Sequence, residues 1–358
     1  MRTLVITAFL LALCASLRAE DLPDYEPQMR VTGVLRSSGS AEMGPLMKLW
    51  EAGFKRVHPD VQFADNLKSS ATAMYGLDMR TADLALMGRP VFPYERYGVY
   101  ERSWVYPAFV EVATGSAERL HKSPAYAIFV HKDNPLAKIS VRELDGVFGA
   151  QRAGGWNALS WDTKVARTPK DDIRTWGALG LVGDWARKPI HPYGKPRLGA
   201  GAITYFQARV MGGGELFNEE LREYAEPARM IADLGRDPLG IAYAPIAFAT
   251  PQVRAIAVSE TPAGPYAPLT RASVGDRSYP LHRPVYIYYT IDDAKTDIAP
   301  ARGDPRAKEF LRYILSRQGQ ADVTREGSYL PLTAPVVREQ LRKLDSTAMP
   351  QEHELMEE

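Results

Sequence analysis

Cysteine is almost absent from this sequence: of 358 residues only Cys14 is a cysteine, and it lies near the N-terminus. A mature chain without the N-terminal segment would have none, which excludes disulfides, thiol catalysis and cysteine metal sites. The six histidines are scattered, and none stands four residues from another as a helical metal pair would. A Gly-x-Ser-x-Gly nucleophile elbow is also missing. We therefore expect no metal, no cofactor and no enzyme activity.

The sequence also lacks an excess of charge of one sign. Lys and Arg number 44 and Asp and Glu 43, which gives a formal net charge of +1. Loss of Arg2 and Arg18 with the first 19 residues would make it −1. Without an overall basic surface, nucleic acid and anionic membranes are excluded as partners. Any selectivity for an anion must come from a local site.

Long hydrophobic runs are missing as well, except for a short one at the N-terminus. The run Leu4–Leu13 follows Arg2 and is followed by small or polar residues as far as Ala19. It is shorter than the roughly 20 residues that span a bilayer. The pattern predicts a secretory signal peptide over residues 1–19 and a soluble, periplasmic mature protein. A buried N-terminal helix is the alternative, and Leu13 is too large for the small residue that precedes a lipid-modified cysteine.

Strand-like and helix-like segments alternate along the rest of the chain. In the first third, strands are expected at 30–36, 61–63 and 83–87, and Pro45 suits the first turn of a helix. In the middle, strands are expected at 126–131, 190–193, 240–244 and 253–258, and Ser140 with Glu143 forms a capping box. Such alternation predicts an α/β fold with mainly parallel sheets. The length suits two lobes of about 100–200 residues.

The last part of the chain returns to the same alternation. A strand is expected at 286–290, followed by a helix with Asp304 at its cap, Pro305 in its first turn and Gly319 at its end. A shorter helix is expected at 334–344. Two stretches lack a period: 151–175, rich in Gly, Trp and charge, indicates an ordered surface insertion, and 261–276 indicates an extended loop.

Three loops rich in glycine or serine each lead into a predicted helix, at 37–44, 68–71 and 198–202. The first N–H groups of a helix lack partners inside the helix, and the helix dipole adds positive potential there. Small residues let an anion approach this backbone closely. Because the loops occur in both halves of the chain, two lobes could close around one ligand.

Five segments follow the motifs of a known family. Residues 39–46 (GSAEMGPL) match a first loop G-S-S/T-T-x-x-P-L, 69–72 (SSAT) a G-S-G-x-G loop, and 82–90 (ADLALMGRP) the segment A-D-I-G-x-x-S-R-P. Residues 127–135 (AIFVHKDNP) and 279–288 (YPLHRPVYIY) match the strands that enter the second lobe and return to the first. The sequence thus resembles the phosphate-binding proteins of bacterial ABC phosphate transporters.

The resemblance implies a type II periplasmic binding fold: α/β, two-lobed, each lobe a mixed, mainly parallel sheet with flanking helices. Lobe 1 would comprise 28–122 and 278–345, lobe 2 would comprise 123–277 with the insertion 151–175, and 346–358 would be a disordered tail. A monomer would bind phosphate or a related small oxyanion between the lobes and deliver it to an inner-membrane ABC permease.

The family's ligand loops carry over to particular residues of this sequence. The candidate ligand-binding residues are Gly39, Ser40, Ser70, Thr72, Arg89, Gly201 and Ala202, followed by Glu42, Ser69, Lys195 and Arg197. Several have a structural alternative. Arg89 could form a salt bridge to Asp83 or Glu95, the two loop cations could be solvated, and Glu42 could point outward in a first helical turn.

The sequence departs from the family at the ligand motifs. Ala200-Gly201-Ala202 stands where S-G-T is usual, Glu42 replaces a hydroxyl residue, and Gly88 stands where many members have a carboxylate. Each charge-assisted hydrogen bond lost from a buried anion costs about 1.5–3 kcal/mol. We therefore expect weaker phosphate binding than the motif usually gives. Two other readings remain: a binding-fold interaction or sensing protein that has lost phosphate, and an exported hydrolase using carboxylates.

Overall fold

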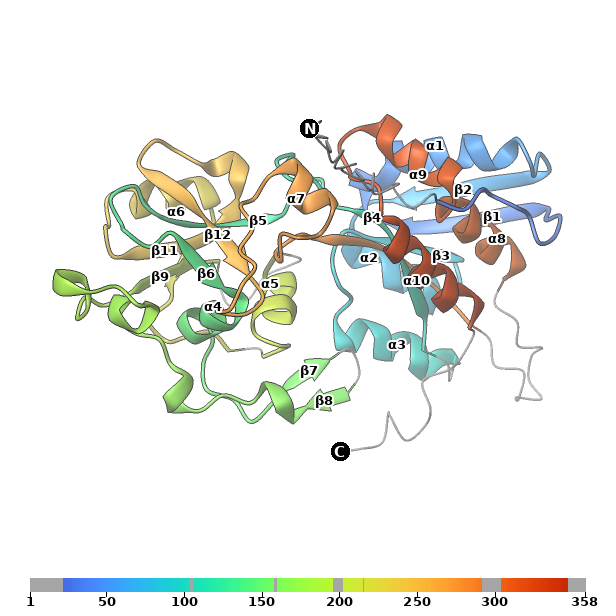
Figure 1. The fold of residues 1–358 in the computed structure, drawn as a ribbon. Helices are drawn as coiled ribbons and strands as arrows, with labels where there is room; N and C mark the ends of the chain where they lie inside the picture. Colours follow the sequence, from blue (N-terminus) through green and yellow to red (C-terminus); the bar gives the residue numbers. More distant parts are fainter. Residues whose placement is uncertain are drawn as a thin grey trace, which may run out of the picture.

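The computed structural model describes residues 22–103, 106–157, 160–195, 202–214, 216–291 and 304–346. Two α/β lobes lie side by side, one built on a five-stranded sheet and the other on a six-stranded sheet (Figure 1). The expected two-lobed α/β fold is confirmed. The predicted signal peptide, Arg197, Gly201 and nearly all of the predicted tail lie outside the described residues.

The sheet of lobe 1 has the strand order β2-β1-β3-β13-β4. Strands β1, β2 and β3 are parallel, and β13 runs antiparallel to both of its neighbours. The strands are β1 (Gly33–Gly39), β2 (Val61–Leu67), β3 (Leu84–Met87), β4 (Ala108–Thr114) and β13 (Pro284–Tyr289). The last strand therefore comes from the end of the chain, after lobe 2 has been completed.

Helices cover both faces of this sheet. Buried side chains of α1 (Gly44–Lys55), α8 (Pro305–Ile314), α9 (Arg317–Glu326) and α10 (Ala334–Asp345) form the main core with one face. A second, smaller cluster joins α2 (Ser70–Asp78) and α3 (Pro93–Ser103) to the other face. A short 3-10 helix, η1 (Ala41–Met43), precedes α1.

The helix after Asp304 does not end at Gly319 as predicted. Helix α8 ends at Ile314, and Gly319 lies inside the next helix, α9. The break occurs because the Ser316 hydroxyl caps α9 and accepts a hydrogen bond from the Gly319 N–H (3.3 Å). A Cβ at Gly319 would lie 2.3 Å from the Tyr313 carbonyl oxygen, so glycine allows the close approach of the two helices rather than a termination.

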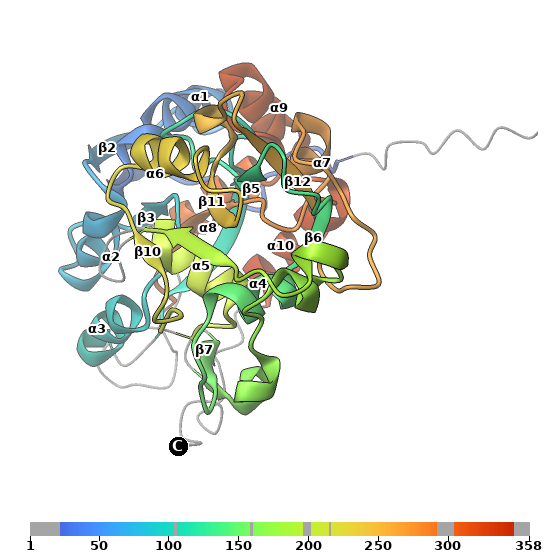
Figure 2. The ribbon, with the colours of Figure 1, turned by 90° about the vertical axis from the view of Figure 1, so that its left-hand side faces the viewer.

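The sheet of lobe 2 has the order β10-β9-β11-β5-β12-β6 and mixes parallel and antiparallel pairs. Its strands are β5 (Tyr126–His131), β6 (Lys138–Ser140), β9 (His191–Gly194), β10 (Arg222–Glu223), β11 (Gly240–Pro245) and β12 (Val253–Ser259). Helices α4 (Val141–Phe148) and α5 (Ala202–Val210) pack on one face and α6 (Pro227–Leu234) on the other (Figure 2).

The predicted capping box of α4 is confirmed: the Ser140 hydroxyl accepts from the Glu143 N–H (3.2 Å), and the Glu143 carboxylate accepts from the Ser140 N–H (2.7 Å). The prediction of an extended loop over 261–276 is wrong in its last part, where α7 (Arg271–Gly275) forms behind a Thr270–Ser273 capping box. The remaining short 3-10 helices are η2 (Thr163–Val165), η3 (Pro169–Asp171), η4 (Trp176–Leu179), η5 (Gly183–Trp185) and η6 (Ile246–Phe248).

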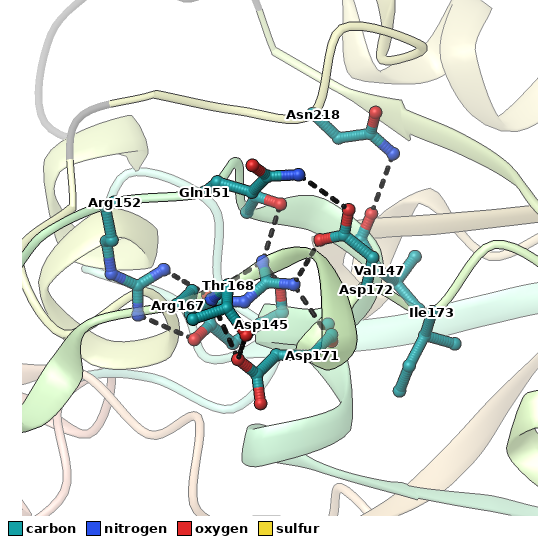
Figure 3. A network of polar contacts seen from close by, with 12 residues as sticks. Asp145, Val147, Gln151, Arg152, Arg167, Thr168, Asp171, Asp172, Ile173 and Asn218 are labelled. Atoms are coloured by element: carbon teal, nitrogen blue, oxygen red, sulfur yellow. Dashed lines mark hydrogen bonds and ion pairs between the residues drawn. The ribbon is translucent and has the colours of Figure 1, made fainter.

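The stretch 151–175 is held to lobe 2 by a network of charged groups around Asp145 of α4 (Figure 3). Asp145 accepts two hydrogen bonds from the Arg152 guanidinium (2.8 and 2.6 Å). The buried Arg167 donates to the Asp145 and Gly149 carbonyls and to the Asp172 carboxylate (2.8 Å). This network supports a hairpin of β7 (Gly155–Asn157) and β8 (Ser160–Asp162).

We predict that Asp145→Ala destabilises the protein by about 3–5 kcal/mol, because it leaves the charge of Arg152 without its carboxylate and leaves Asp172 as the one carboxylate beside the buried Arg167. Urea denaturation measures this free energy of unfolding. The control is Asp184→Ala, whose side chain is exposed, and which should change stability by no more than about 0.5 kcal/mol. Equal stability of the two variants would show that the network does not hold the insertion.

Candidate functional site

The carboxyl ends of β1 and β3 bring the predicted loops of lobe 1 together. Gly39 pairs with Leu86, and the Ser40 N–H donates to the Leu86 carbonyl (2.9 Å). The Gly88 N–H, just after β3, donates to the Ser70 hydroxyl at the start of α2 (3.2 Å). In open α/β sheets, ligands bind outside the carboxyl ends of parallel strands. Ser40, Ser70 and Gly88 therefore lie at that end of the sheet and are candidates for ligand contact.

Glycine is required at position 39 by the close contact between these strands. Its φ is +138°, and a Cβ there would lie 2.2 Å from the Leu86 carbonyl oxygen. The next residue, Ser40, is buried, and its hydroxyl donates to the exposed Glu42 carboxylate (2.7 Å). Glu42 therefore accepts the hydrogen bond of the Ser40 hydroxyl, which the sequence predicts as a ligand-binding group.

The hydroxyls of Ser69 and Thr72 serve the first turn of α2. Ser69 caps the helix by accepting from the Ala71 N–H (3.2 Å), and the Thr72 hydroxyl donates to the Ser69 carbonyl (2.8 Å). Both residues are exposed. Of the three hydroxyl residues predicted here, Ser70 is the one that the structure joins to Gly88.

Arg89 forms the salt bridge that was the alternative to ligand binding. Its guanidinium makes two hydrogen bonds to Glu95 (2.8 and 2.6 Å), and both side chains are about 5% exposed. The ring of Phe92 lies 4.5 Å from the guanidinium. The other proposed partner, Asp83, pairs with Arg36 instead (2.7 Å). Because the Glu95 carboxylate already binds the Arg89 guanidinium, we do not count Arg89 among the residues that contact a ligand.

A cation that the sequence reasoning missed, Arg283, lies at the junction of the lobes. It is 8% exposed, and its guanidinium donates to the Gly88 carbonyl (3.0 Å). The rings of Tyr126 and Tyr205 in lobe 2 lie 5.6 and 5.4 Å from it. Its Nε is buried without a hydrogen-bond partner, and no carboxylate among the described residues pairs with it. The available signal was a basic residue within 279–288, the segment that matches the strand returning to the first lobe.

The chain crosses between the lobes twice, first between β4 and β5 and again between α7 and β13. These two crossings are bonded to each other around Arg283. The Gly115 N–H donates to the Arg283 carbonyl (2.7 Å), and the Tyr126 N–H donates to the Leu281 carbonyl (3.2 Å). The Ser123 hydroxyl donates to the same Gly88 carbonyl as Arg283 does (2.8 Å). The position of the guanidinium is therefore fixed from lobe 1 and from both crossings.

Helix α5 of lobe 2 also contacts this junction. It begins at Ala202, and the Tyr205 hydroxyl donates to the His282 carbonyl. Lys195 is half-buried, and its N–H donates to the Tyr243 hydroxyl (3.4 Å). The contacts thus join Ser70 to Gly88, and they join Arg283 to Gly88 and to the Tyr205 ring of α5. Ser40 is linked to this group through the pairing of β1 with β3.

Comparison with known proteins agrees with this architecture. Residues 26–318 match the model of the PBP superfamily domain. The phosphate-binding protein PstS of Pseudomonas aeruginosa is 30% identical over 323 residues, which are 90% of each chain. This chain belongs to the phosphate-binding protein family.

Other family members are more distant in sequence. The phosphate-binding protein PstS of Staphylococcus saprophyticus is 20% identical over 87% of this chain and 85% of that protein. The crystal structure of PstS from Borrelia burgdorferi superimposes with a TM-score of 0.51 at 13% identity, over 84% of this chain and 98% of that one. The second comparison shows the shared fold.

In this chain, the space beside Gly88 explains why a carboxylate is missing from its position. A Cβ at Gly88 would lie 2.7 Å from the Ser123 hydroxyl oxygen. An acidic side chain would therefore displace Ser123 from the Gly88 carbonyl.

Among the described residues, no helix is long and apolar enough to cross a membrane, and no group of three His, Cys, Asp or Glu is placed to hold a metal ion.

We predict that acid weakens the junction through His282. Burial lowers its pKa to about 4, whereas an unfolded histidine has a pKa of about 6.5. Between these values the unfolded chain binds more protons, so the contribution of His282 to stability is complete above about pH 6.5 and is lost as the pH falls towards 4. The variant His282→Gln should lose less stability than the wild type between pH 7 and pH 4.5, measured by urea denaturation.

The matched control is the exposed His121, replaced by asparagine because its φ is +65°. His121→Asn should keep the wild-type dependence of stability on pH. The same dependence in His282→Gln would show that another group causes the loss of stability in acid.

Proposed function

We propose that this protein is an extracytoplasmic solute-binding protein that takes phosphate or a related small oxyanion between its lobes and delivers it to an ABC transporter. The observation that carries the proposal is the buried Arg283 guanidinium without a carboxylate at the junction of the lobes. A buried charge is costly unless it is paired and hydrogen-bonded. An oxyanion would supply the missing charge.

The chemistry of the neighbouring groups supports an oxyanion. The planar guanidinium fork fits the geometry of phosphate and carboxylate oxygens. Ser40 and Ser70 add hydroxyls, and the N-termini of α2 and α5 add positive helix-dipole potential. At α2 the Ala71 and Thr72 N–H groups are already bonded to Ser69. Arg283 offsets part of the loss caused by alanine at positions 200 and 202, because a charged donor contributes more than a neutral hydroxyl.

The position of the site supports a closing movement. Arg283 contacts Gly88 of lobe 1 and the rings of Tyr126 and Tyr205 of lobe 2. An anion held by both lobes binds the closed arrangement better than an open one, and this difference in affinity shifts the population towards closure. A closed, loaded protein is the form that a transporter would recognise.

The family membership supports the cellular setting of the proposal. The curated relative from Pseudomonas aeruginosa is named a phosphate-binding protein. We propose a monomer in the periplasm, exported by a signal peptide over residues 1–19, with an inner-membrane ABC permease as its partner. The lobe boundaries at 122–123 and 277–278 stay part of this proposal.

We predict that Arg283→Met weakens phosphate binding by about 100-fold, the loss expected for one buried charge-assisted hydrogen-bonding group. Isothermal titration calorimetry of the folded variants measures the dissociation constant. Arg283→Lys, which keeps the charge without the fork, should lie between Arg283→Met and the wild type. The control is Arg236→Met, whose side chain is 78% exposed, and which should bind as the wild type does.

The wild type should be stabilised by about 2.7 kcal/mol when phosphate is at 100 times its dissociation constant. Unchanged affinity of Arg283→Met would remove Arg283 from the site. A wild-type protein that responds to none of phosphate, sulfate and molybdate would contradict oxyanion binding and favour an interaction or sensing role. Turnover of a chromogenic ester that is lost on replacing Glu42 would favour the hydrolase.

We predict that Glu42→Gln strengthens phosphate binding by about five- to tenfold. The substitution removes a negative charge beside the anion and weakens the competition for the Ser40 hydroxyl, which together amount to about 1 kcal/mol. Titration at two salt concentrations measures it, and the gain should shrink at higher salt because Glu42 is exposed. Glu118→Gln, half-exposed in the first crossing, is the control. Weaker binding by Glu42→Gln would indicate that the carboxylate accepts a phosphate proton.

A further inference from the structure

A cavity of about 310 Å³ lies between the lobes, and neither Ser40, Ser70, Gly88 nor Arg283 is among the residues that line it. Lobe 1 lines it with aromatic side chains of β4, β13 and the segment before α3, including Phe109 and Tyr288. Lobe 2 lines it with Trp156 of the β7–β8 hairpin and Thr204 of α5. Its volume is at the lower end of the 300–1,000 Å³ typical of small-molecule sites.

The cavity contains a buried cation without a partner, Arg96 of α3. Arg96 is 8% exposed, and its Nε is buried without a hydrogen bond. Its guanidinium lies 5.7 Å from the Tyr106 ring and 6.0 Å from the Phe109 ring. No hydrogen bond or ion pair joins its side chain to any residue that the structure describes. Burial lowers the pKa of Arg96, as expected for a charge removed from water without compensation.

The other polar groups of the cavity leave a single positive charge uncompensated. Glu111 is paired with Arg277 (2.6 Å), and Lys343 is paired with Glu339 (2.9 Å). The Thr204 hydroxyl is buried and has no hydrogen-bond partner. Besides the Gln207 side chain, which also lines it, the cavity therefore presents one guanidinium and one free hydroxyl among aromatic rings.

The lobe 2 wall of the cavity is a built surface. The hairpin approaches the end of α5 so closely that a Cβ at Gly213 would lie 1.9 Å from the Trp156 carbonyl oxygen. The Trp156 ring packs edge-to-face on Trp161 at 5.5 Å. The Asp145 network anchors the insertion that carries the hairpin (Figure 3). The insertion 151–175 thus has a consequence for binding: it brings an aromatic ring of lobe 2 to the wall of the cavity, opposite the residues of lobe 1.

We propose that this cavity is a second binding site, for a small aromatic carboxylate. The carboxylate would accept hydrogen bonds from the Arg96 guanidinium and from the Thr204 hydroxyl, and the ring of the ligand would lie among the aromatic side chains. One guanidinium matches one carboxylate in charge and geometry. A phosphate dianion would keep an uncompensated charge in an aromatic cavity, which disfavours inorganic phosphate here.

The proposal does not depend on phosphate binding by the first site. Arg96 and Thr204 have no hydrogen bond to Ser40, Ser70 or Arg283 among the described residues. Because the lining comes from both lobes, an occupant would contact both at once and stabilise the arrangement that encloses it.

Benzoate is the probe, titrated into the full chain by calorimetry, with acetate and benzyl alcohol as partial analogues. We expect benzoate to bind with a dissociation constant below about 1 mM. Acetate, which lacks the ring, and benzyl alcohol, which lacks the charge, should each bind at least about tenfold more weakly. Absence of benzoate binding at 10 mM, or equal binding of benzyl alcohol, would overturn the proposal.

Two variants test the polar contacts. Arg96→Met should weaken benzoate binding by about 30-fold or more, and Thr204→Val, which keeps the size of the side chain, by about three- to tenfold. The control is Arg102→Met on the same helix, whose side chain is 50% exposed and outside the cavity, and which should bind as the wild type does. Wild-type benzoate affinity in both cavity variants would overturn the proposal, whether or not Arg96→Met alters stability.

Phosphate separates the two sites. Arg96→Met should keep the phosphate affinity of the wild type within about threefold, and Arg283→Met should keep benzoate binding within the same limit. Complete competition of benzoate by phosphate, together with loss of benzoate binding in Arg283→Met, would place the organic anion in the first site and contradict a second one. A protein that binds benzoate but no inorganic oxyanion would leave this proposal standing and remove the proposed function.

Discussion

The hydrogen bond from the Arg283 guanidinium to the Gly88 carbonyl is the contact on which the junction of the lobes depends. It places a positive charge at the end of β3, between two rings of lobe 2, in a site from which water is largely excluded. The protein then contains a buried cation whose solvation has been replaced by one carbonyl and two aromatic faces. Such a group is poorly compensated without an anion. The hydroxyl and N–H groups of the loops, which alone would bind an anion weakly, would then act together with a charged donor.

This arrangement changes the meaning of the departures from the family motif. Alanine at positions 200 and 202 removes hydroxyls from the loop of lobe 2, and Gly88 removes a carboxylate from lobe 1. Both changes simplify the set of groups around the proposed anion. A site that relies on a guanidinium and backbone N–H groups recognises charge and shape more than the protonation state of the ligand. We infer that such a site discriminates less between phosphate and other tetrahedral oxyanions.

Local signals in the sequence predicted the elements well, and contacts distant in sequence decided the site. The capping box at Ser140 and the cap at Asp304 depend on neighbours within three residues, and both form as predicted. Arg89 and Arg283 are both basic residues beside proline, and only the packing of α3 supplies Glu95 to one and leaves the other without a carboxylate. The predicted end of the helix after Asp304 was wrong because a glycine can either end a helix or allow two helices to pack closely, as Gly319 does. Sequence alone did not distinguish termination from close packing.

The same contrast between paired and unpaired arginines separates structural from binding roles across the molecule. Arg167 is as buried as Arg96, but it has the carboxylates of Asp145 and Asp172 within reach and holds the insertion in place. Arg96 has aromatic rings instead. Two carboxylates lie beside the buried Arg167, and none pairs with Arg96 beside the cavity. A shortage of acidic residues in the protein does not explain this difference. The difference is therefore best explained by a ligand that pairs with Arg96. Without such a ligand Arg96 would be an uncompensated buried charge, and its replacement by methionine would increase stability.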